Sequence, residues 1–536
     1  MEQNFERGKK VEEKAAVLKK IEREELIEIK DLVKSLEEDL DNNEIEQIFK
    51  DKAFDLAIKN EGFKGKISLL YEVLLYKLGV IPRVSLDKYR KDYILKKKLE
   101  TIQNKICILE QMTNEIMDYD YKNQKCEPEK SVQQKEKKHQ KQEKWNINGY
   151  IAFLVETLDK GGLEQVVALL ATEFSKRAID VKVLCLQQGG SIAQRLRESG
   201  IEIKEFNNQM RLFEKYIKKN PPILINTHFV KREIKFISNQ GIPIIDVIHN
   251  MYVFFSKRAI RKEQENAKYY SQMIAVSEIV RDTYYTHIMK NDKIEVIGNA
   301  AAVRGDLLKS RDSIRRELKI DKGDIVLLNI GSIDSRKNQI GIIEAFNIAS
   351  QVTSRKLKLF MAGNVQDQEY FNRVQETIGK SPVKFNIKLL PYYENVRELY
   401  SMADVFILDS YYEGWSIAAT EALYEGLPVI HSECGSAKEL VNSGRYGIMI
   451  KNPIGDIQKL DTEHVTERIM QCENRNIDEA VSAIVVMVDN IDRWRNERET
   501  ISRETIEKFS IQNMCENYLD LFEKCIEYNK GIDMKK

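Results

Sequence analysis

From Gly149 onward, short runs of β-branched and other apolar residues alternate with longer stretches in which apolar residues recur at helical spacing. This alternation predicts βαβ units, which build parallel sheets covered by helices. The expected strands are 150–155, 181–185, 223–225, 244–248, 273–276, 294–297, 324–330, 357–361, 388–390, 405–408 and 429–430. This part of the chain, about 390 residues, is too long for one sheet and suits two, with a boundary between residues 300 and 320. Such sheets bind ligands at the carboxyl ends of their strands, so we expect functional residues in the loops there.

The first 145 residues have a different character. Residues 1–144 carry 31 basic and 30 acidic side chains and show no strand pattern. Apolar residues recur at helical spacing, as at Val17, Ile21, Ile29 and Leu32,. We expect an all-α region over 1–145, in part coiled coil, with a solvated linker near 133–145. Its helices either mediate oligomer or partner contact or pack as a cap on the next domain, and the sequence leaves both open.

The overall composition excludes several classes of protein. The chain has 85 Lys plus Arg against 84 Asp plus Glu, whereas a dedicated nucleic-acid binder carries a basic surplus,. It has no apolar run of about 18 residues and a strongly charged amino terminus, so we expect neither a transmembrane segment nor a secretory signal. Its seven scattered cysteines favour a reducing compartment over disulfides or a zinc site,. The expected location is cytoplasmic, and peripheral association with the inner face of a membrane stays open.

Paired glycines, Gly161 and Gly162, follow the first expected strand and open an apolar helix. Glycine lets the backbone approach a ligand closely, and the amides at a helix start favour anions. The same turn also serves a strand-to-helix connection without any ligand, so the motif by itself leaves both interpretations open.

A second loop, beginning at Gly331 and Ser332, follows the strand 324–330 and contains adjacent cations, Arg336 and Lys337. A guanidinium and an ammonium at the carboxyl end of a strand suit a diphosphate, because they neutralise its oxygens. An ordinary solvated turn is the alternative.

The third motif carries the most information. Residues 410–422 follow the strand 405–408, with Glu413 in the loop and Glu421 inside the next helix. A carboxylate accepts two hydrogen bonds and suits neighbouring hydroxyls, whereas the amides at a helix start suit phosphate. We therefore expect both carboxylates to border one crevice, with the phosphate-binding helix start between them. A nucleotide-sugar has its groups in the same order, with a diphosphate between two sets of hydroxyls.

These residues resemble a known family. Residues from about 148 to 525 are similar to retaining glycosyltransferases of the GT-B fold, in the glycosyltransferase family 4 and group 1 set that carries an E-x7-E motif, here Glu413 and Glu421. Further matches, in the order of the family, are Ile248-His249, Ala275-Val276-Ser277-Glu278, Val296-Ile297-Gly298-Asn299, Ala362-Gly363, and the segments 399–404, 425–430 and 444–447.

The resemblance implies a domain organisation. The fold class is α/β, of the GT-B type, with two Rossmann-like domains whose parallel sheets face a central cleft, preceded by the all-α region. Residues 146–305 are expected to form the acceptor-side domain and 306–500 the nucleotide-sugar domain. Residues 501–536 are expected to form a helix that crosses back to the first Rossmann-like domain.

The resemblance also implies roles for the donor site. Glu421 would hold the ribose hydroxyls, Glu413 would position the donor sugar, and Lys337 would bind the diphosphate. The other expected donor-site residues are Gly331, Ser332, Arg336, Tyr392 near the base, and the helix-start residues Gly414, Trp415, Ser416 and Ile417. The family often has Arg directly after the loop glycine, and this chain has Ser332 there, so we expect Arg336 to supply the missing cation.

On the acceptor side, the loop Gly161-Gly162 would close over the phosphate and acceptor region, together with Asn299. His249 would contact the donor sugar or the acceptor and, with Glu413 and Lys337, make up the expected catalytic set. His228 is expected to line the same cleft.

The function that the resemblance implies is a retaining, metal-independent glycosyltransferase that moves a sugar from a nucleoside-diphosphate sugar to a glycan, lipid-linked or protein acceptor. It would need no cofactor besides that donor. The D-x-D sequences that metal-dependent glycosyltransferases of the other fold use occur here only in the helical region, at 39–41 and 118–120. The alternatives are a nucleotide-sugar epimerase on the same fold and a catalytically silent scaffold in a glycan-assembly complex.

Overall fold

The computed structural model describes residues 148–159, 161–302, 307–391, 393 and 395–533, and the side chains only as far as 529. The chain divides into two compact units, Met1–Asn123 and Gln124–Lys536, and all described residues belong to the second. The expectations for the helical region 1–145 and its linker lie outside the described residues.

The first sheet has seven parallel strands in the order β3-β2-β1-β4-β5-β6-β7. Its strands are β1 Ile151–Val155, β2 Val181–Cys185, β3 Glu202–Glu205, β4 Leu224–His228, β5 Ile244–Ile248, β6 Gln272–Ala275 and β7 Ile294–Val296. The helices that connect them are α7 Gly162–Lys176, α8 Ser191–Glu198, α9 Met210–Lys219, α10 Ile234–Asn239, α11 Lys257–Asn266 and α12 Glu278–His287. The central strands β1, β4 and β5 are buried along their whole length, as expected for a parallel sheet covered on both faces,.

The second sheet has six parallel strands in the order β10-β9-β8-β11-β12-β13. Its strands are β8 Ile325–Ile330, β9 Leu357–Ala362, β10 Ile387–Leu390, β11 Val405–Leu408, β12 Val429–Ser432 and β13 Gly447–Ile450. Its helices are α13 Arg311–Glu317, α14 Gln339–Val352, α15 Gln368–Lys380, α16 Val396–Met402, α17 Ile417–Tyr424 and α18 Ala437–Val441, with short 3-10 turns η1 Ser335–Lys337 and η2 Lys384–Asn386. Because β8 and β11 are neighbours, the loops that follow them lie at the same edge of the sheet.

The two parallel sheets confirm the expected GT-B architecture, and every strand expected from the sequence is present. The sequence pattern missed β3 and β13, which are edge strands. β3 reads Glu-Ile-Lys-Glu and alternates between exposed and half-buried residues, so it lacks the apolar run of the buried strands,. The expected domain boundaries at 146, 306 and 501 stay predictions.

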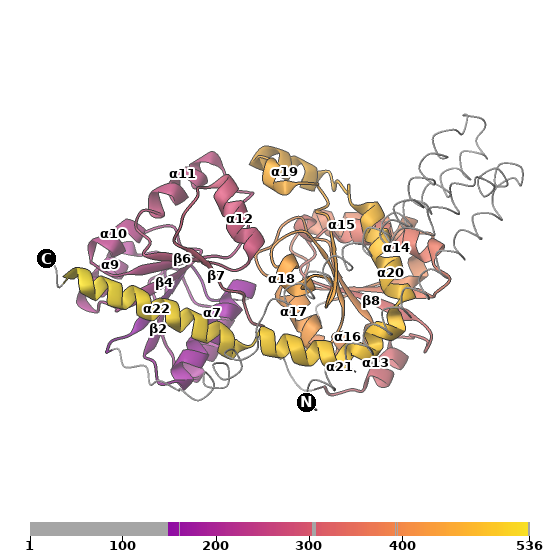
Figure 1. The fold of residues 1–536 in the computed structure, drawn as a ribbon, viewed down its shortest axis with the longest axis horizontal. Helices are drawn as coiled ribbons and strands as arrows, with labels where there is room; N and C mark the ends of the chain where they lie inside the picture. Colours follow the sequence, from indigo (N-terminus) through magenta and orange to yellow (C-terminus); the bar gives the residue numbers. More distant parts are fainter. Residues whose placement is uncertain (1–147, 160, 303–306, 392, 394, 534–536) are drawn as a thin grey trace, which may run out of the picture. The chain divides into compact units, whose positions relative to one another are not determined.

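The carboxyl-terminal helices contact both sheet domains. After η3 Ile457–Lys459, α19 Thr462–Met470 and α20 Ile477–Asp489, the long helix α21 Ile491–Lys508 packs on α17, where Thr505 donates a hydrogen bond to the Leu423 carbonyl at 3.0 Å. The last helix, α22 Ile511–Asp533, runs alongside α7 (Figure 1), with the rings of Phe522 and Phe174 6.0 Å apart. In the part of the chain that the structure describes, no helix has both the length and the apolar character needed to cross a membrane.

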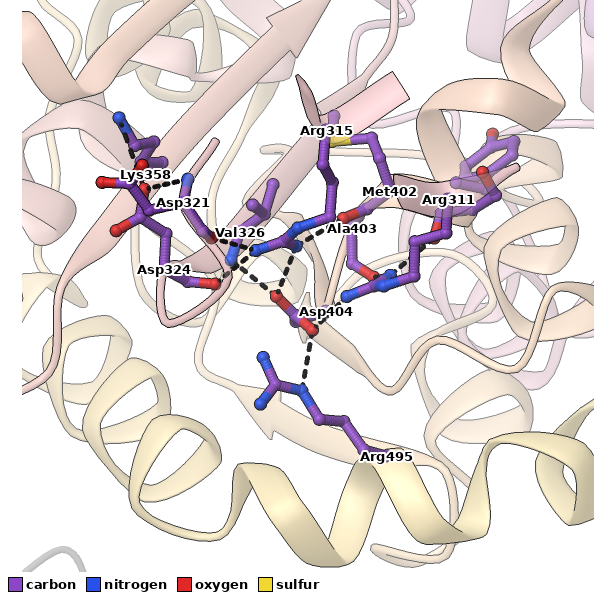
Figure 2. A network of polar contacts seen from close by, with 12 residues as sticks. Arg311, Arg315, Asp321, Asp324, Val326, Lys358, Met402, Ala403, Asp404 and Arg495 are labelled. Carbon is purple, nitrogen blue, oxygen red and sulfur yellow. Dashed lines mark hydrogen bonds and ion pairs between the residues drawn. The ribbon is translucent and has the colours of Figure 1, made fainter. Parts of the chain in front are cut away.

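A cluster of arginines around Asp404 fixes the amino-terminal edge of the second sheet (Figure 2). Asp404 is fully buried directly before β11, and it accepts hydrogen bonds from the Val326 amide at 2.9 Å and from Arg311 at 2.6 Å. Arg315 and Arg495 also pair with it. Burial alone raises the pKa of Asp404, but the guanidinium groups outweigh it, and the pKa lies below its usual range. This network joins α13 and α21 to the amino-terminal ends of the strands, opposite the carboxyl ends at which the site is expected.

Candidate active site

The loop after β11 meets the loop after β5 at Gly414. A Cβ built on Gly414 would lie 1.7 Å from the carbonyl oxygen of His249, so only glycine fits at this position. Ser277, the N-cap of α12, also contacts this loop through the Gly414 carbonyl, at 3.5 Å. The contact brings the residue that follows Glu413 against the His249 backbone, although the two loops follow strands of different sheets.

The paired-glycine loop lies near the start of α17. A Cβ built on Gly162 would lie 3.8 Å from Cγ1 of Ile417, an ordinary contact distance. Ser416 caps α17 by accepting a hydrogen bond from the Ala419 amide, and its own amide donates to Ser436 Oγ at 3.0 Å. The Ser416 amide is therefore engaged within the protein, and it reaches a ligand only if that bond gives way.

Lys337 and Glu413 form an ion pair across the loops that follow β8 and β11. Both side chains are largely buried, with 15% and 9% of their surfaces exposed. Burial alone raises the pKa of Glu413, but the charges of Lys337 and Arg336 outweigh it and keep the pKa below its usual range. The site therefore holds an ionised carboxylate next to a preorganised cation.

Arg336 lies beside this pair. Its guanidinium is 5.8 Å from the ring centre of Tyr412 and 3.4 Å from Asp334, the carboxylate that caps η1. Burial by itself lowers the pKa of Arg336, but Glu413 and Asp334 raise it above its usual value. The Tyr412 ring also stacks on Phe254 of the first domain, with 5.2 Å between the ring centres, so Tyr412 contacts both Arg336 and the first domain.

The Ser332 hydroxyl donates a hydrogen bond to Asp334 Oδ2. Gly331 lies under the aliphatic part of Lys337, with a built Cβ 3.6 Å from Lys337 Cε. A Cβ on Gly363 would lie 1.8 Å from the Gly331 carbonyl oxygen, so this glycine is needed to let the two loops approach.

Glu421 lies within α17 and is buried. Tyr400, on α16, donates a hydrogen bond from its hydroxyl to Glu421 Oε2 at 3.0 Å. A small pocket opens beside this carboxylate, lined by Ala302, Val396, Arg397, Tyr400, Glu421, Tyr424 and Glu425. The second carboxylate of the E-x7-E motif therefore borders this pocket.

The two histidines expected at the cleft differ in position. His249 is partly exposed, whereas His228 is only 1% exposed and lies behind it, with His228 Nδ1 2.8 Å from His249 Nε2. Burial, followed by the charge of Lys231, lowers the pKa of His249 to about 3. Both rings are therefore neutral, and the buried His228 contacts His249.

Two expected residues, Trp415 and Asn299, are buried. The Trp415 indole donates to Thr420 Oγ1 at 2.9 Å and packs against Phe509, so its expected contribution to a ligand is limited to the backbone. Asn299 is buried, at 4% exposure. Tyr392, the expected contact to the base, lies outside the described residues.

Sequence reasoning missed three contributors to this region: Asn226, Tyr412 and Lys231. The polar triplet Asn226-Thr227-His228 at the end of an otherwise apolar strand was a usable signal. Lys231 is ion-paired at 2.9 Å to both Asp246 and Glu263, which sequence spacing does not reveal.

Comparison with known proteins agrees with this fold. Residues 160–303 match the family described as Glycosyltransferase Family 4, and residues 310–473 match the family described as Glycosyl transferases group 1. An uncharacterized glycosyltransferase of Methanocaldococcus jannaschii is 26% identical over 244 residues, which cover 42% of this chain and 61% of that relative's length.

Two solved structures share the fold over most of their length. A glycosyltransferase from Rickettsia africae aligns with a TM-score of 0.57 at 17% identity and covers 71% of this chain and 99% of its own. Anabaena HepE, in complex with UDP and glucose, aligns with a TM-score of 0.54 at 17% identity and covers 70% of this chain and 100% of its own. This chain belongs to the group 1, family 4 glycosyltransferases, retaining GT-B enzymes that take a sugar from a nucleotide-sugar donor.

Proposed function

We propose that the donor is a nucleoside-diphosphate sugar bound at the carboxyl edge of the second sheet. In this arrangement Lys337 and Arg336 neutralise the diphosphate, Glu413 positions the sugar, and Glu421 holds the ribose. The observation that carries the proposal is the buried Lys337–Glu413 pair, which joins a cation suited to phosphate and a carboxylate suited to hydroxyls in neighbouring loops,.

The charges suit departure of a nucleoside diphosphate. Negative charge develops on the leaving phosphate, and a cation fixed before the reaction stabilises that charge without reorganisation. Lys337 is held by Glu413 on one side and packs along Gly331 on the other, so its position is set before the donor arrives. We propose that Lys337, an ammonium with three N–H donors, binds the donor phosphate from this position while Glu413 accepts hydrogen bonds from the sugar hydroxyls.

Glu421 suits the ribose for a different reason. Its carboxylate is already oriented by the Tyr400 hydroxyl, and the recess beside it is lined by side chains from α16 and α17. A carboxylate has about four acceptor positions on its two oxygens, which suits it to two neighbouring hydroxyls.

The contact between Gly414 and His249 supports an acceptor site on the first domain. Sugar transfer requires that water be kept from the activated donor, and the loops of both sheets meet at this contact,. We propose that the acceptor hydroxyl attacks from the side of His249, on the face that the phosphate leaves. The departing phosphate takes the hydroxyl proton as the new glycosidic bond forms and the old one breaks, so the configuration is retained.

The first experiment is a thermal-shift panel of UDP, GDP, ADP, CMP and dTDP sugars. UDP-glucose enters first, because HepE was crystallised with UDP and glucose. A ligand at 100 times its dissociation constant stabilises the native state by about 2.7 kcal/mol, which such an assay resolves. The expected result is that the nucleotide-sugars of one base raise the melting temperature and that Lys337→Met abolishes this shift.

Lys358→Met is the matched control. Lys358 is also an ion-paired lysine of the second domain, at 19% exposure and 3.5 Å from Asp324, but it lies at the opposite edge of the sheet. The proposed location of the donor site is wrong if both variants lose the thermal shift equally or if Lys337→Met retains it.

Product analysis separates the remaining functions. Transfer to a glycan, lipid-linked or protein acceptor consumes that acceptor and releases the nucleoside diphosphate. An epimerase gives an isomerised nucleotide-sugar without using an acceptor. A scaffold role is favoured if no nucleotide-sugar in the panel stabilises the protein or is turned over.

A further inference from the structure

A chain of buried polar groups runs along the carboxyl ends of β4 and β5 and ends at His249. Asn226 is fully buried, and its amide nitrogen donates to the Ile245 carbonyl at 3.0 Å. This bond fixes the orientation of the amide, because the reverse orientation would place two oxygens against each other. The Asn226 carbonyl oxygen must therefore face His228, whose Nε2 lies 2.8 Å away.

The orientation of Asn226 fixes the proton on His228. A carbonyl oxygen accepts hydrogen bonds and cannot donate, so His228 Nε2 must carry the hydrogen. A neutral imidazole has one N–H, which leaves His228 Nδ1 as an acceptor. That acceptor lies 2.8 Å from His249 Nε2, so the hydrogen of His249 is on Nε2 as well.

One ring nitrogen of His249 is then left as an acceptor. Its Nδ1 makes no hydrogen bond to any residue in the described ranges, and the side chain is partly exposed beside the Gly414 loop. A bare nitrogen accepts a hydrogen bond from an O–H group, whereas a phosphate oxygen offers it no hydrogen.

The surroundings keep His249 neutral. The Lys231 ammonium lies beneath the site, paired with Asp246 and Glu263. Burial and then this cation hold the pKa of His249 far below neutrality, and burial together with His249 does the same for His228. A cationic His249 would carry hydrogens on both nitrogens and would lose its acceptor.

We propose that Asn226 and His228 are positioning residues that hold His249 with Nδ1 unprotonated, so that His249 accepts a hydrogen bond from a sugar hydroxyl in the cleft and does not contact phosphate. This inference rests on the proposed function only for the identity of the ligand. The direction of the hydrogen bonds that join Asn226, His228 and His249 is a property of the protein without a ligand.

The direct test is the tautomer of His249, measured by nitrogen-15 NMR on histidine-labelled full-length protein at pH 7, with the His249 signals assigned by their loss in His249→Gln. The expected state is neutral with the hydrogen on Nε2. If His249 in the wild-type protein is protonated on Nδ1 or is cationic, the inference is wrong. The measurement needs no turnover, so its failure is distinct from failure of the proposed function, which shows as absence of donor binding and transfer.

Two variants of His228 test the positioning role. His228→Asn keeps an amide oxygen near the position of Nδ1, whereas His228→Leu removes the acceptor. We expect His228→Leu to lower kcat/KM for transfer by about tenfold or more and to mix the tautomers of His249, since a buried N–H loses its partner. His228→Asn is expected to retain most of both properties.

The hydroxyl is identified with deoxy sugars. Donors and acceptors that lack one hydroxyl at a time are compared in wild-type and His249→Leu enzymes. For the hydroxyl that His249 contacts, the deoxy substrate and the substitution cause the same loss, and together they cause no more than either alone. If the losses multiply at every position, His249 contacts no sugar hydroxyl and the inference fails. Equal melting temperatures of the His228 variants separate the effect from misfolding.

Discussion

Gly414 and His249 are in backbone contact, with the Gly414 Cα against the His249 carbonyl oxygen. This contact joins the loop that carries the first glutamate of the E-x7-E motif to the loop that carries the histidine, and it allows no side chain between them. The spacing between these two loops therefore depends on a glycine at position 414.

Gly414→Ala tests this dependence. The added methyl group must displace the His249 carbonyl, and a shift of about 1 Å in a reacting geometry costs on the order of 100-fold in rate. We expect kcat/KM for sugar transfer to fall by that order while the protein remains folded. Gly323→Ala is the control, since a Cβ there meets nothing within 4 Å. Steady-state kinetics of both variants decide the question, and an unchanged rate in Gly414→Ala would show that the two domains separate at this contact during catalysis.

Glu413→Gln tests the role of the carboxylate near the donor sugar. Glutamine still accepts a hydrogen bond from Lys337 but carries no charge, so the fold is kept and the electrostatic contribution is lost. We expect kcat to fall by roughly 100-fold or more, as for other preorganised polar groups at a reacting centre, with a smaller change in donor affinity. Asp324→Asn removes the matching carboxylate from the Lys358 pair and should leave kcat unchanged. Similar kcat losses in both variants would point to a stability effect.

Arg336→Ala tests whether this arginine replaces the cation absent at Ser332. Arg336 lies over Tyr412 and close to Glu413, and a donor diphosphate would gain a charge-assisted bond from it,. We expect the donor dissociation constant, measured by calorimetry, to rise about tenfold. Tyr412→Leu removes the ring and keeps the cation, so it separates the charge from the stacking. Wild-type affinity in Arg336→Ala, together with lost affinity in Lys337→Ala, would rule the replacement out.

Asp404→Asn tests the arginine network of Figure 2. Because the folded-state pKa of Asp404 is lowered, its contribution to stability is present above the pKa of the unfolded chain, about 3.9, and is lost as the pH falls through the folded value,. The substitution leaves the arginines without their buried carboxylate, and we expect the free energy of unfolding at pH 7 to fall by about 3 kcal/mol. Urea unfolding at pH 7 and pH 3 measures this, and the variant should lose less stability than the wild type on acidification. At urea concentrations at which both proteins are folded, the donor affinity of the variant should equal that of the wild type.

Most of the fold was predictable because buried parallel strands have a local signature. The apolar runs at β1, β5 and β8 are visible in the sequence, and so are the glycine and glutamate motifs that follow β1, β8 and β11. Strand β3 was not predictable, since an edge strand with alternating charged residues lacks that signature.

The sequence by itself determined the order of the strands and loops and the residue types at each strand end, because these depend on short stretches of chain. Only the tertiary structure decided which strand ends are neighbours. Lys337 meets Glu413 because β8 pairs with β11, and His228 lies behind His249 because β4 pairs with β5. The physical reason is that sheet order and side-chain burial arise from packing across the whole domain, so the charge of Glu413 and the proton position on His249 are set by partners distant in the chain.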